Sequence, residues 1–261
     1  MLRQVHFTGA AGHRLSGFHL AGNMPGMVLA GGYGQFSPVT KAFGQRVIAY
    51  CQARNLELHI IEFRGQGDSE GHRFKIAIPD MRDDLLALAE HFDLSDRIAI
   101  GSSLGAWAML AAQQERPSFF WGKLALAPAV DWDRTYLLPR LDDGRATREA
   151  DRAIVVRDDN ILVFDRFLDS AEDVRVLAGQ GPLFRGPVRI LHGSEDMIAP
   201  LSRSLDLLTE LAEGNDAALR IFPGLDHDVS LLNAASVQRG FIEECDLLLQ
   251  AFRRYLADRG G

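Results

Sequence analysis

The chain contains the stretch Arg97-Ile98-Ala99-Ile100-Gly101-Ser102-Ser103-Leu104-Gly105, in which a short apolar run leads into a G-x-S-x-G pattern. The apolar run is typical of a buried strand, and Ser103 to Gln114 has a helical pattern. Ser103 therefore lies where a strand turns sharply into a helix, and the glycines remove side chains that would collide with neighbouring backbone. Because the glycines are symmetric about Ser103 and not Ser102, Ser103 is the predicted nucleophile. A glycine-rich turn without chemistry is the alternative.

A serine hydroxyl is a weak nucleophile at neutral pH, so it needs a base nearby and a third group that orients the base. Downstream, the segment His192-Gly193-Ser194-Glu195-Asp196-Met197-Ile198-Ala199-Pro200 follows an expected strand at Val188 to Leu191. The triplet Asp226-His227-Asp228 follows a second expected strand, at Ala218 to Phe222. Ligand-binding residues gather at the carboxyl ends of such strands. Asp196 and His227 are therefore the candidate partners of Ser103.

Short strand patterns alternate with longer helical patterns over most of the chain. This alternation favours a mostly parallel sheet with helices on both faces, an α/β fold. The other expected strands are Val5 to Thr8, Leu15 to Leu20, Met27 to Ala30, Leu56 to Phe63 and Leu124 to Leu126, and the other expected helices are Val39 to Asn55, Pro79 to His91, Leu201 to Ala212 and Val237 to Tyr255.

The alternation stops between about Val130 and Arg185, where Asp and Arg are dense and short apolar patches are interspersed. A structureless loop of that length is improbable inside a compact domain, so a small helical insertion is expected. The chain then divides into a core of residues 1–129 and 186–261, interrupted by an insertion at 130–185.

The composition excludes several classes of protein. With 47% apolar and 24% charged residues among 261, the chain is neither disordered nor a coiled coil. Its 28 basic and 35 acidic residues give a net charge of −7, which argues against binding to nucleic acid or to anionic lipid. No apolar stretch is long enough to cross a membrane and no signal peptide is evident, so a cytoplasmic location without membrane insertion is expected. Cys51 and Cys245 are expected to be buried free thiols.

Taken together, these features resemble the α/β-hydrolase superfamily over nearly the whole chain. The shared motifs are GSSLG at Gly101 to Gly105, HGSEDMIAP at His192 to Pro200, DHD around His227, and EFRGQGDSEG at Glu62 to Gly71. The resemblance implies that Ser103 is the nucleophile, that His227 is the general base and then the acid, and that Asp196 orients His227. It also implies a structural role for His192 and for the Arg64 loop, and a cap formed by the insertion.

Two backbone N–H groups are expected to form an oxyanion hole. The helix that begins at Leu104 offers one N–H and the positive end of its dipole. The resemblance places the second in the loop Gly31-Gly32-Tyr33-Gly34, at Tyr33, although many relatives have His-Gly where this chain has two glycines. A turn without a catalytic role is the alternative for this loop. The Tyr33 ring is a candidate wall of the acyl pocket.

The predicted function is hydrolysis of a carboxylic ester or thioester of a small to medium acyl substrate through an acyl-serine intermediate. This mechanism needs no cofactor, and no metal-binding motif accompanies the DHD triplet. The alternatives are a hydrolase or acyltransferase acting on amide or carbon–carbon bonds, a non-catalytic ligand-binding protein of the same fold, and a scaffold protein that uses the charged insertion. The sequence does not indicate the oligomeric state.

Overall fold

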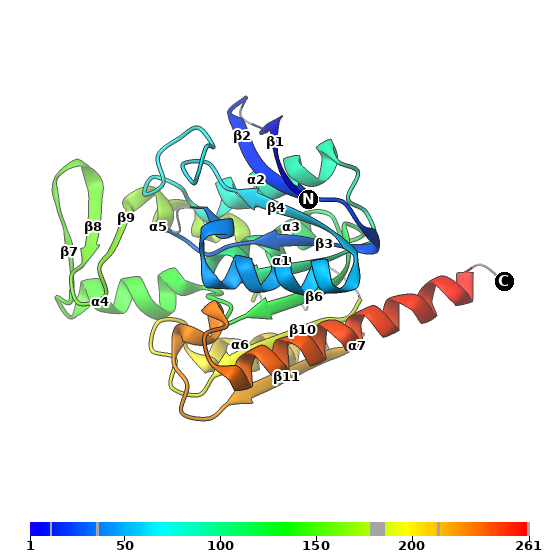
Figure 1. Ribbon diagram of the computed structural model, residues 1–261. Helices are drawn as coiled ribbons and strands as arrows, with labels where there is room; N and C mark the ends of the chain where they lie inside the picture. Colours follow the sequence, from blue (N-terminus) through cyan, green and yellow to red (C-terminus); the bar gives the residue numbers. More distant parts are fainter. Residues whose placement is uncertain (11, 35–36, 178–185, 213–214, 260–261) are drawn as a thin grey trace.

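The computed structural model describes residues 1–10, 12–34, 37–177, 186–212 and 215–259 (Figure 1). An eight-stranded sheet lies at its centre, with the strands in the order β1-β2-β4-β3-β5-β6-β10-β11. These strands are β1 (Leu2–Thr8), β2 (Arg14–Leu20), β3 (Asn23–Ala30), β4 (Leu56–Glu62), β5 (Arg97–Ser102), β6 (Phe120–Leu126), β10 (Val188–Gly193) and β11 (Ala217–Phe222). β2 pairs antiparallel with β1 and β4, and all the other pairs are parallel. The expected mostly parallel sheet is confirmed.

Helices cover both faces of the sheet. α2 (Ile78–His91), α3 (Leu104–Glu115) and α6 (Leu201–Ala212) contribute to one core, and α1 (Ala42–Arg54) and α7 (Ala235–Arg259) contribute to the other. Successive strand residues point to opposite faces, so Val28 enters the first core and Leu29 the second. The expected helix over Val39 to Asn55 is interrupted, because a 3₁₀ turn at Pro38–Thr40 ends in extended backbone at Lys41. No helix in the described part of the chain combines the length and apolar content needed to cross a bilayer.

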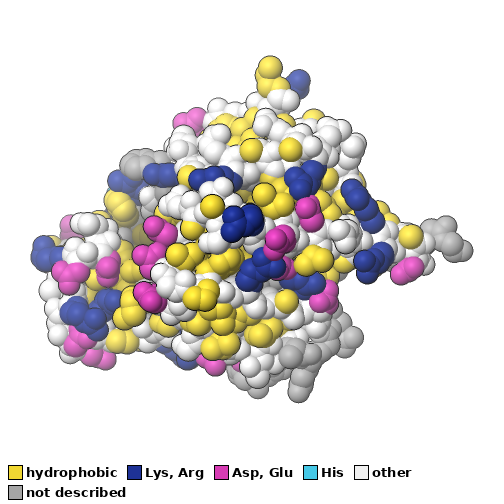
Figure 2. All heavy atoms as spheres, turned by 60° about the horizontal axis from the view of Figure 1, so that its bottom comes forward, with side chains coloured by type: hydrophobic (Ala, Val, Ile, Leu, Met, Phe, Trp, Pro, Cys, Tyr) yellow, Lys and Arg dark blue, Asp and Glu magenta, His cyan; other side chains and the backbone are white. Residues whose placement is uncertain are grey.

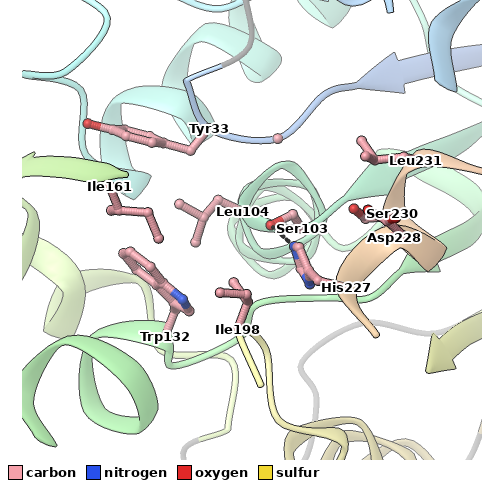
Figure 3. A pocket seen from close by; sticks show the side chains of 11 residues that line it. Tyr33, Ser103, Leu104, Trp132, Ile161, Ile198, His227, Asp228, Ser230 and Leu231 are labelled. Atoms are coloured by element: carbon pink, nitrogen blue, oxygen red, sulfur yellow. Dashed lines mark hydrogen bonds between the residues drawn. The ribbon is translucent and has the colours of Figure 1, made fainter. Parts of the chain in front are cut away.

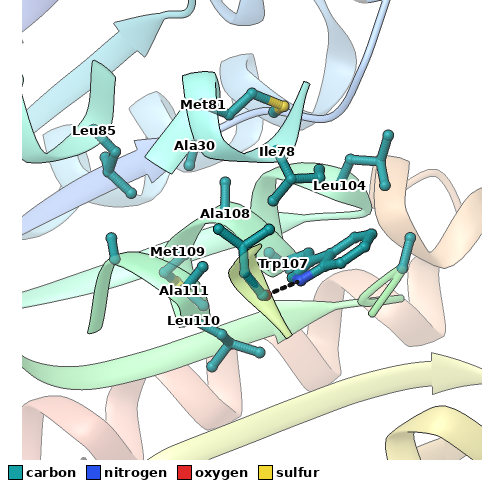
Figure 4. Packing of buried hydrophobic residues seen from close by; sticks show 14 of the residues in the cluster. Ala30, Ile78, Met81, Leu85, Leu104, Trp107, Ala108, Met109, Leu110 and Ala111 are labelled. Carbon is teal, nitrogen blue, oxygen red and sulfur yellow. Dashed lines mark hydrogen bonds between the residues drawn. The ribbon is translucent and has the colours of Figure 1, made fainter. Parts of the chain in front are cut away.

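Trp107 is part of the first core (Figure 4). It is fully buried on α3, and its indole Nε1 donates a hydrogen bond of 2.9 Å to the carbonyl O of Val174. This bond joins the core to the end of the insertion. In this position Trp107 contributes to the packing of the core.

The insertion contains a second sheet as well as helices. Its elements are a π-helical turn (Asp133–Leu137), α4 (Leu138–Asp142), β7 (Ala146–Arg148), a 3₁₀ turn (Ala150–Arg152), β8 (Ala153–Val156), β9 (Ile161–Phe164), α5 (Asp165–Ala171) and a 3₁₀ turn (Glu172–Val174). β7, β8 and β9 form an antiparallel sheet, which lies beside the main body in Figure 1. The expected end of the insertion, residues 178–185, lies outside the described residues.

The expectation of a small helical insertion does not hold for β7, β8 and β9, which form a sheet. β8 and β9 are rich in β-branched residues, which favour a pleated surface over a helix. The tight turn between them places Asn160 in the left-handed region at φ 51°, a conformation that asparagine tolerates well.

Charged side chains of both signs are interspersed on the face shown in Figure 2. Ion pairs between elements occur in this protein, such as that of Arg54 of α1 with Asp246 of α7, whose Nε and Oδ1 lie 3.0 Å apart. On this face the basic residues do not gather into one patch of the kind that binds a phosphate backbone.

Candidate active site

Ser103 lies at the turn between β5 and α3 in a conformation that is uncommon for a residue with a side chain, with φ 54° and ψ −124°. The turn is held by a hydrogen bond of 2.9 Å from Ser103 N to Leu126 O. A Cβ on Gly101 would lie 2.5 Å from the Cα of Ala106, and a Cβ on Gly105 would lie 2.5 Å from the carbonyl O of Ala30. The two glycines therefore allow the close approach that the predicted sharp turn requires.

The structure brings Ser103, His227 and Asp196 together, as predicted. His227 Nε2 lies 3.0 Å from Ser103 Oγ, a contact drawn in Figure 3. On the other side of the ring, His227 Nδ1 lies 2.7 Å from Asp196 Oδ2. The imidazole is thus placed to accept a proton from the hydroxyl while its second nitrogen donates to the carboxylate.

Asp196 is buried after β10 and held by several donors. Its Oδ1 accepts hydrogen bonds from the backbone N of Ile198 and Ala199, at 2.9 and 2.8 Å. Burial alone would raise the pKa of Asp196, but the interactions with His192 and His227 outweigh burial and hold the pKa well below that of an ordinary aspartate. The carboxylate therefore stays ionised and fixed in position opposite the imidazole.

His192 has the structural position that the resemblance implies. It is fully buried, with Nδ1 2.7 Å from Ser204 Oγ and Nε2 2.7 Å from Ala199 O. Its Nε2 also lies 3.3 Å from Asp196 Oδ2, so it supports the carboxylate and does not replace His227.

His227 begins a 3₁₀ turn, His227–Leu231, directly after the loop that follows β11. Asp226 caps this turn, because its Oδ1 accepts a hydrogen bond of 2.9 Å from Asp228 N. Asp226 and Asp228 are both exposed, and so is Glu195, which precedes Asp196 in the chain. Of these acidic residues, only Asp196 is buried against the His227 ring.

The residues of the two expected oxyanion donors, Leu104 and Tyr33, line the same cavity as Ser103. Leu104 N is the first N–H of α3, and such a group has no partner within its own helix. Tyr33 follows β3, the strand next to β5, so its loop lies beside the turn at Ser103. Gln66 supports this loop, because its Nε2 donates a hydrogen bond of 3.1 Å to Gly32 O. The structural role expected for the Arg64 loop does not include this contact, which joins the loop after β4 to the loop after β3.

The rest of the Arg64 loop agrees with a structural role. The Arg64 guanidinium pairs with Asp84 at 2.6 Å and with Asp80 at 2.9 Å, and all three side chains are largely shielded from water. Asp80 also pairs with Arg166 of the insertion. The Asp80 carboxylate of α2 therefore links this helix to the Arg64 loop and to the insertion.

A cavity of about 220 Å³ opens beside Ser103 and His227. Figure 3 shows Tyr33, Leu104, Trp132 and Ile161 around it on one side. Its wall is made by Gly32, Tyr33, Ser103, Leu104, Trp132, Ile161, Ile198, His227, Asp228, Ser230 and Leu231. The candidate lining position of the Tyr33 ring is confirmed.

The insertion contributes Trp132 and Ile161 to the cavity wall. Other apolar residues of the insertion, such as Tyr136 and Phe167, are buried in the first core and attach the insertion to the body. Trp132 Nε1 is shielded from solvent and has no hydrogen-bond partner among the residues that the structure describes. The insertion therefore both docks on the core and shapes the cavity.

Comparisons with known proteins agree with this architecture. The model of the prolyl oligopeptidase family matches residues 79–253. Palmitoyl-protein thioesterase ABHD10, mitochondrial, of Mus musculus is 28% identical over 207 residues, which cover 77% of this chain and 69% of that protein. Monoacylglycerol lipase of Mycolicibacterium smegmatis is 25% identical over 235 residues, or 78% of this chain and 81% of the lipase.

Solved structures show the same fold. Alpha/beta hydrolase domain-containing protein 10 from mouse superposes with a TM-score of 0.82 at 22% identity, and the match covers 95% of this chain and 99% of that one. The mostly parallel sheet, the helices on both faces and this likeness confirm the expected α/β-hydrolase fold.

Proposed function

This chain belongs to the prolyl oligopeptidase family within the α/β-hydrolase superfamily, and from that premise we propose that it is a serine hydrolase that cleaves a carboxylic ester or thioester. Its relatives support hydrolysis of such bonds, since they include a thioesterase and a monoacylglycerol lipase. Ser103 is the nucleophile, His227 the base and acid, and Asp196 the orienting carboxylate. The observation that carries the proposal is the continuous contact from Ser103 Oγ through the His227 ring to Asp196 Oδ2, at 3.0 and 2.7 Å.

Acylation begins when Ser103 Oγ attacks the carbonyl carbon and His227 Nε2 takes the hydroxyl proton. The carbonyl oxygen becomes an oxyanion that accepts hydrogen bonds from the backbone N–H groups of Leu104 and Tyr33. When the tetrahedral intermediate collapses, His227 gives its proton to the departing alcohol or thiol. A water molecule then attacks the acyl-serine by the same steps, which release the carboxylic acid and restore the hydroxyl.

The acyl group occupies the cavity beside Ser103, and residues 130–185 act as a cap over it. Trp132 and Ile161 of the insertion support this role because they line the cavity together with Tyr33. The volume of about 220 Å³ is below the roughly 300–1,000 Å³ of pockets that bury drug-sized ligands, which favours a small to medium acyl group. A series of p-nitrophenyl esters from acetate to palmitate tests this size, and kcat/KM is expected to fall for the longest chains.

The nucleophile is tested with a fluorophosphonate that labels activated serines. Wild-type protein should take up one label per chain and Ser103→Ala none, and ester turnover should fall by about four to six orders of magnitude in the variant. Ser102→Ala is the matched control, because the Ser102 hydroxyl is buried and donates to Ser230 O at 2.9 Å. Equal labelling of the wild type and Ser103→Ala would reject the assignment.

Amide hydrolysis is the second candidate, because the name of the matched family refers to peptide cleavage. An oxygen ester, a thioester and an anilide that share one acyl group distinguish esterase or thioesterase activity from amidase activity. The kcat/KM values are first corrected for the intrinsic reactivity of each leaving group. If the corrected kcat/KM is still higher for the ester and the thioester than for the anilide, the result supports the first proposal.

The cytoplasmic location stays a prediction. The word mitochondrial in the name of the mouse relative applies to that protein. Fractionation of cells that express this chain at its native level, followed by immunodetection, tests the location directly.

A further inference from the structure

A cluster of potential metal ligands lies where β2 pairs with β4, away from the triad. His19 and His59 are directly opposite each other in this antiparallel pair, and Glu57 is two residues before His59 on the same face of β4. The donor atoms of these three residues all lie within 4.8 Å of one another. Glu57 is near the start of β4, whereas the triad lies at the carboxyl ends of the parallel strands (Figure 1).

The distances in this cluster are too long for good hydrogen bonds. Glu57 Oε1 lies 3.7 Å from His19 Nε2 and 3.5 Å from His59 Nε2, beyond the usual 2.7–3.2 Å of an N–H···O bond. They are close to the separation of about 3.4 Å between two ligand atoms that share a tetrahedral Zn²⁺ at roughly 2.0–2.1 Å from each. Each histidine nitrogen is therefore spaced from Glu57 Oε1 about as two ligands of one ion are.

The surroundings hold the three side chains in place. The two imidazole rings stack with centroids 4.5 Å apart, and the ring of His59 also contacts Phe92 at 4.9 Å. Arg97 Nε binds the other carboxylate oxygen, Glu57 Oε2, at 2.8 Å, which leaves Oε1 facing the histidines. Carboxylates that bind metals are commonly fixed by such an outer hydrogen bond.

One candidate ligand atom lacks a hydrogen bond in the described part of the chain. His19 Nε2 is shielded from solvent and makes no hydrogen bond with any residue that the structure describes. A buried polar atom without a partner destabilises the folded state, and a bound cation would satisfy this one. Two imidazoles and a carboxylate partly neutralised by arginine favour a transition metal over Mg²⁺ or Ca²⁺, which prefer oxygen ligands.

We propose that His19, Glu57 and His59 bind one divalent transition-metal ion of the Zn²⁺ type, with water as the fourth ligand. The ion ties β2 to β4 and stabilises the antiparallel end of the sheet. It takes no part in acyl transfer, so the site is independent of the proposed function. These ligands form no sequence motif, because His19 is far along the chain from Glu57 and His59 and only the strand register brings them together.

Isothermal titration of the chelator-treated full chain with ZnSO₄ tests the proposal, with Co²⁺ absorption as a second readout. The wild type should bind one ion per chain and show a higher Tm with the ion. His19→Gln and Glu57→Gln each remove a direct ligand, so each should raise Kd by more than the roughly ten- to hundredfold that the loss of an outer-shell partner costs, and should abolish the shift in Tm. His19→Gln is the more informative variant, because it leaves the ion pair between Glu57 and Arg97 intact. His72→Gln, which changes an exposed histidine elsewhere, should bind like the wild type.

The triad also contains an imidazole and a carboxylate, so His227→Gln is tested beside these variants. One ion still bound with unchanged Kd in His227→Gln supports the proposed site. Loss of binding in His227→Gln but not in His19→Gln would place the ion at the triad and overturn the proposal. Absence of stoichiometric binding to the wild type would overturn it as well.

Discussion

Gln66 holds the carbonyl O of Gly32 through a hydrogen bond of 3.1 Å from its Nε2, and its Oε1 accepts a bond of 3.2 Å from Phe63 N. The side chain is only 3% exposed, so both bonds are shielded from water. The C=O of Gly32 and the N–H of Tyr33 belong to one planar peptide unit and point in opposite directions. By fixing the carbonyl, Gln66 therefore fixes the direction of the proposed oxyanion donor.

Gln66→Glu is expected to lower kcat by about 10- to 100-fold with little change in KM, because a carboxylate can accept from Phe63 N but cannot donate to Gly32 O. The loss should approach that of removing an oxyanion donor, which is about 10²–10³-fold. Steady-state kinetics with an activated ester measures it. Gln113→Glu is the matched control, since Gln113 is also buried and bridges Phe120 N and Pro117 O. An equal fall in kcat in both variants would show a general effect on stability and contradict the positioning role.

Tyr33→Phe distinguishes the role of the Tyr33 hydroxyl from that of the Tyr33 backbone N–H. The hydroxyl lies 2.8 Å from Phe74 O and 3.1 Å from Leu162 O, so it joins the core to β9 of the insertion. Its removal should lower the free energy of unfolding by about 1 kcal/mol, whereas the backbone N–H remains and kcat should change only a few-fold. Urea denaturation and ester kinetics measure the two quantities. A loss of activity as large as that of Ser103→Ala would contradict this separation.

Gly105→Ala is expected to disrupt the site, because the added Cβ would collide with the carbonyl oxygens of Gly31 and Ala30. The collision pushes α3 away from β3 and changes the distance from Ser103 to the Tyr33 loop. Activity should fall at least a hundredfold, and the free energy of unfolding should fall by about 1–3 kcal/mol. Gly122→Ala is the control, since a Cβ there has only contacts of 3.5 Å or longer. Wild-type activity in Gly105→Ala would contradict the inference that the site requires close packing at Gly105.

Asp196 should make the stability of the fold sensitive to acid. The lowered pKa of its buried carboxyl means that the ionised form stabilises the folded state. This stabilisation is fully present above the unfolded pKa of about 3.9 and is lost as the pH falls from there toward the folded pKa. Between about pH 5 and 2, the free energy of unfolding should therefore fall more steeply in the wild type than in Asp196→Asn. Urea denaturation at several pH values measures the slopes, and Asp173→Asn, at an exposed site, should follow the wild type.

Both cysteines should be unreactive in the folded protein. Burial raises the pKa of Cys51 to about 12 and that of Cys245 well above its ordinary value. Since the thiolate is the reactive form, a disulfide reagent at pH 8 should label neither residue in native protein and both in urea. The expectation of buried free thiols is confirmed by their burial and by the lack of a bridge between them. Rapid labelling of one thiol in the native state would contradict this prediction.

The sheet and the meeting of Ser103, Asp196 and His227 could be predicted because each depends on local patterns. Ser103 lies between glycines at a strand end, and Asp196 and His227 follow strands of their own. The contact from Gln66 to Gly32 joins loops after two different strands, so no spacing reveals it. The β7–β9 sheet does not follow from local patterns for a similar reason: Ile161 to Phe164 fits a strand or a buried helix segment until its pairing with β8 is known.

Trp132 lines the cavity, yet its indole Nε1 is shielded from solvent and has no hydrogen-bond partner among the described residues. A buried donor without a partner costs about 1–3 kcal/mol, and this cost is already present before any substrate binds. The insertion therefore carries an unsatisfied polar group beside Ser103. Exchange of the indole for a ring without an N–H would remove that penalty but weaken the stack with Tyr136, whose ring centroid lies 4.7 Å away.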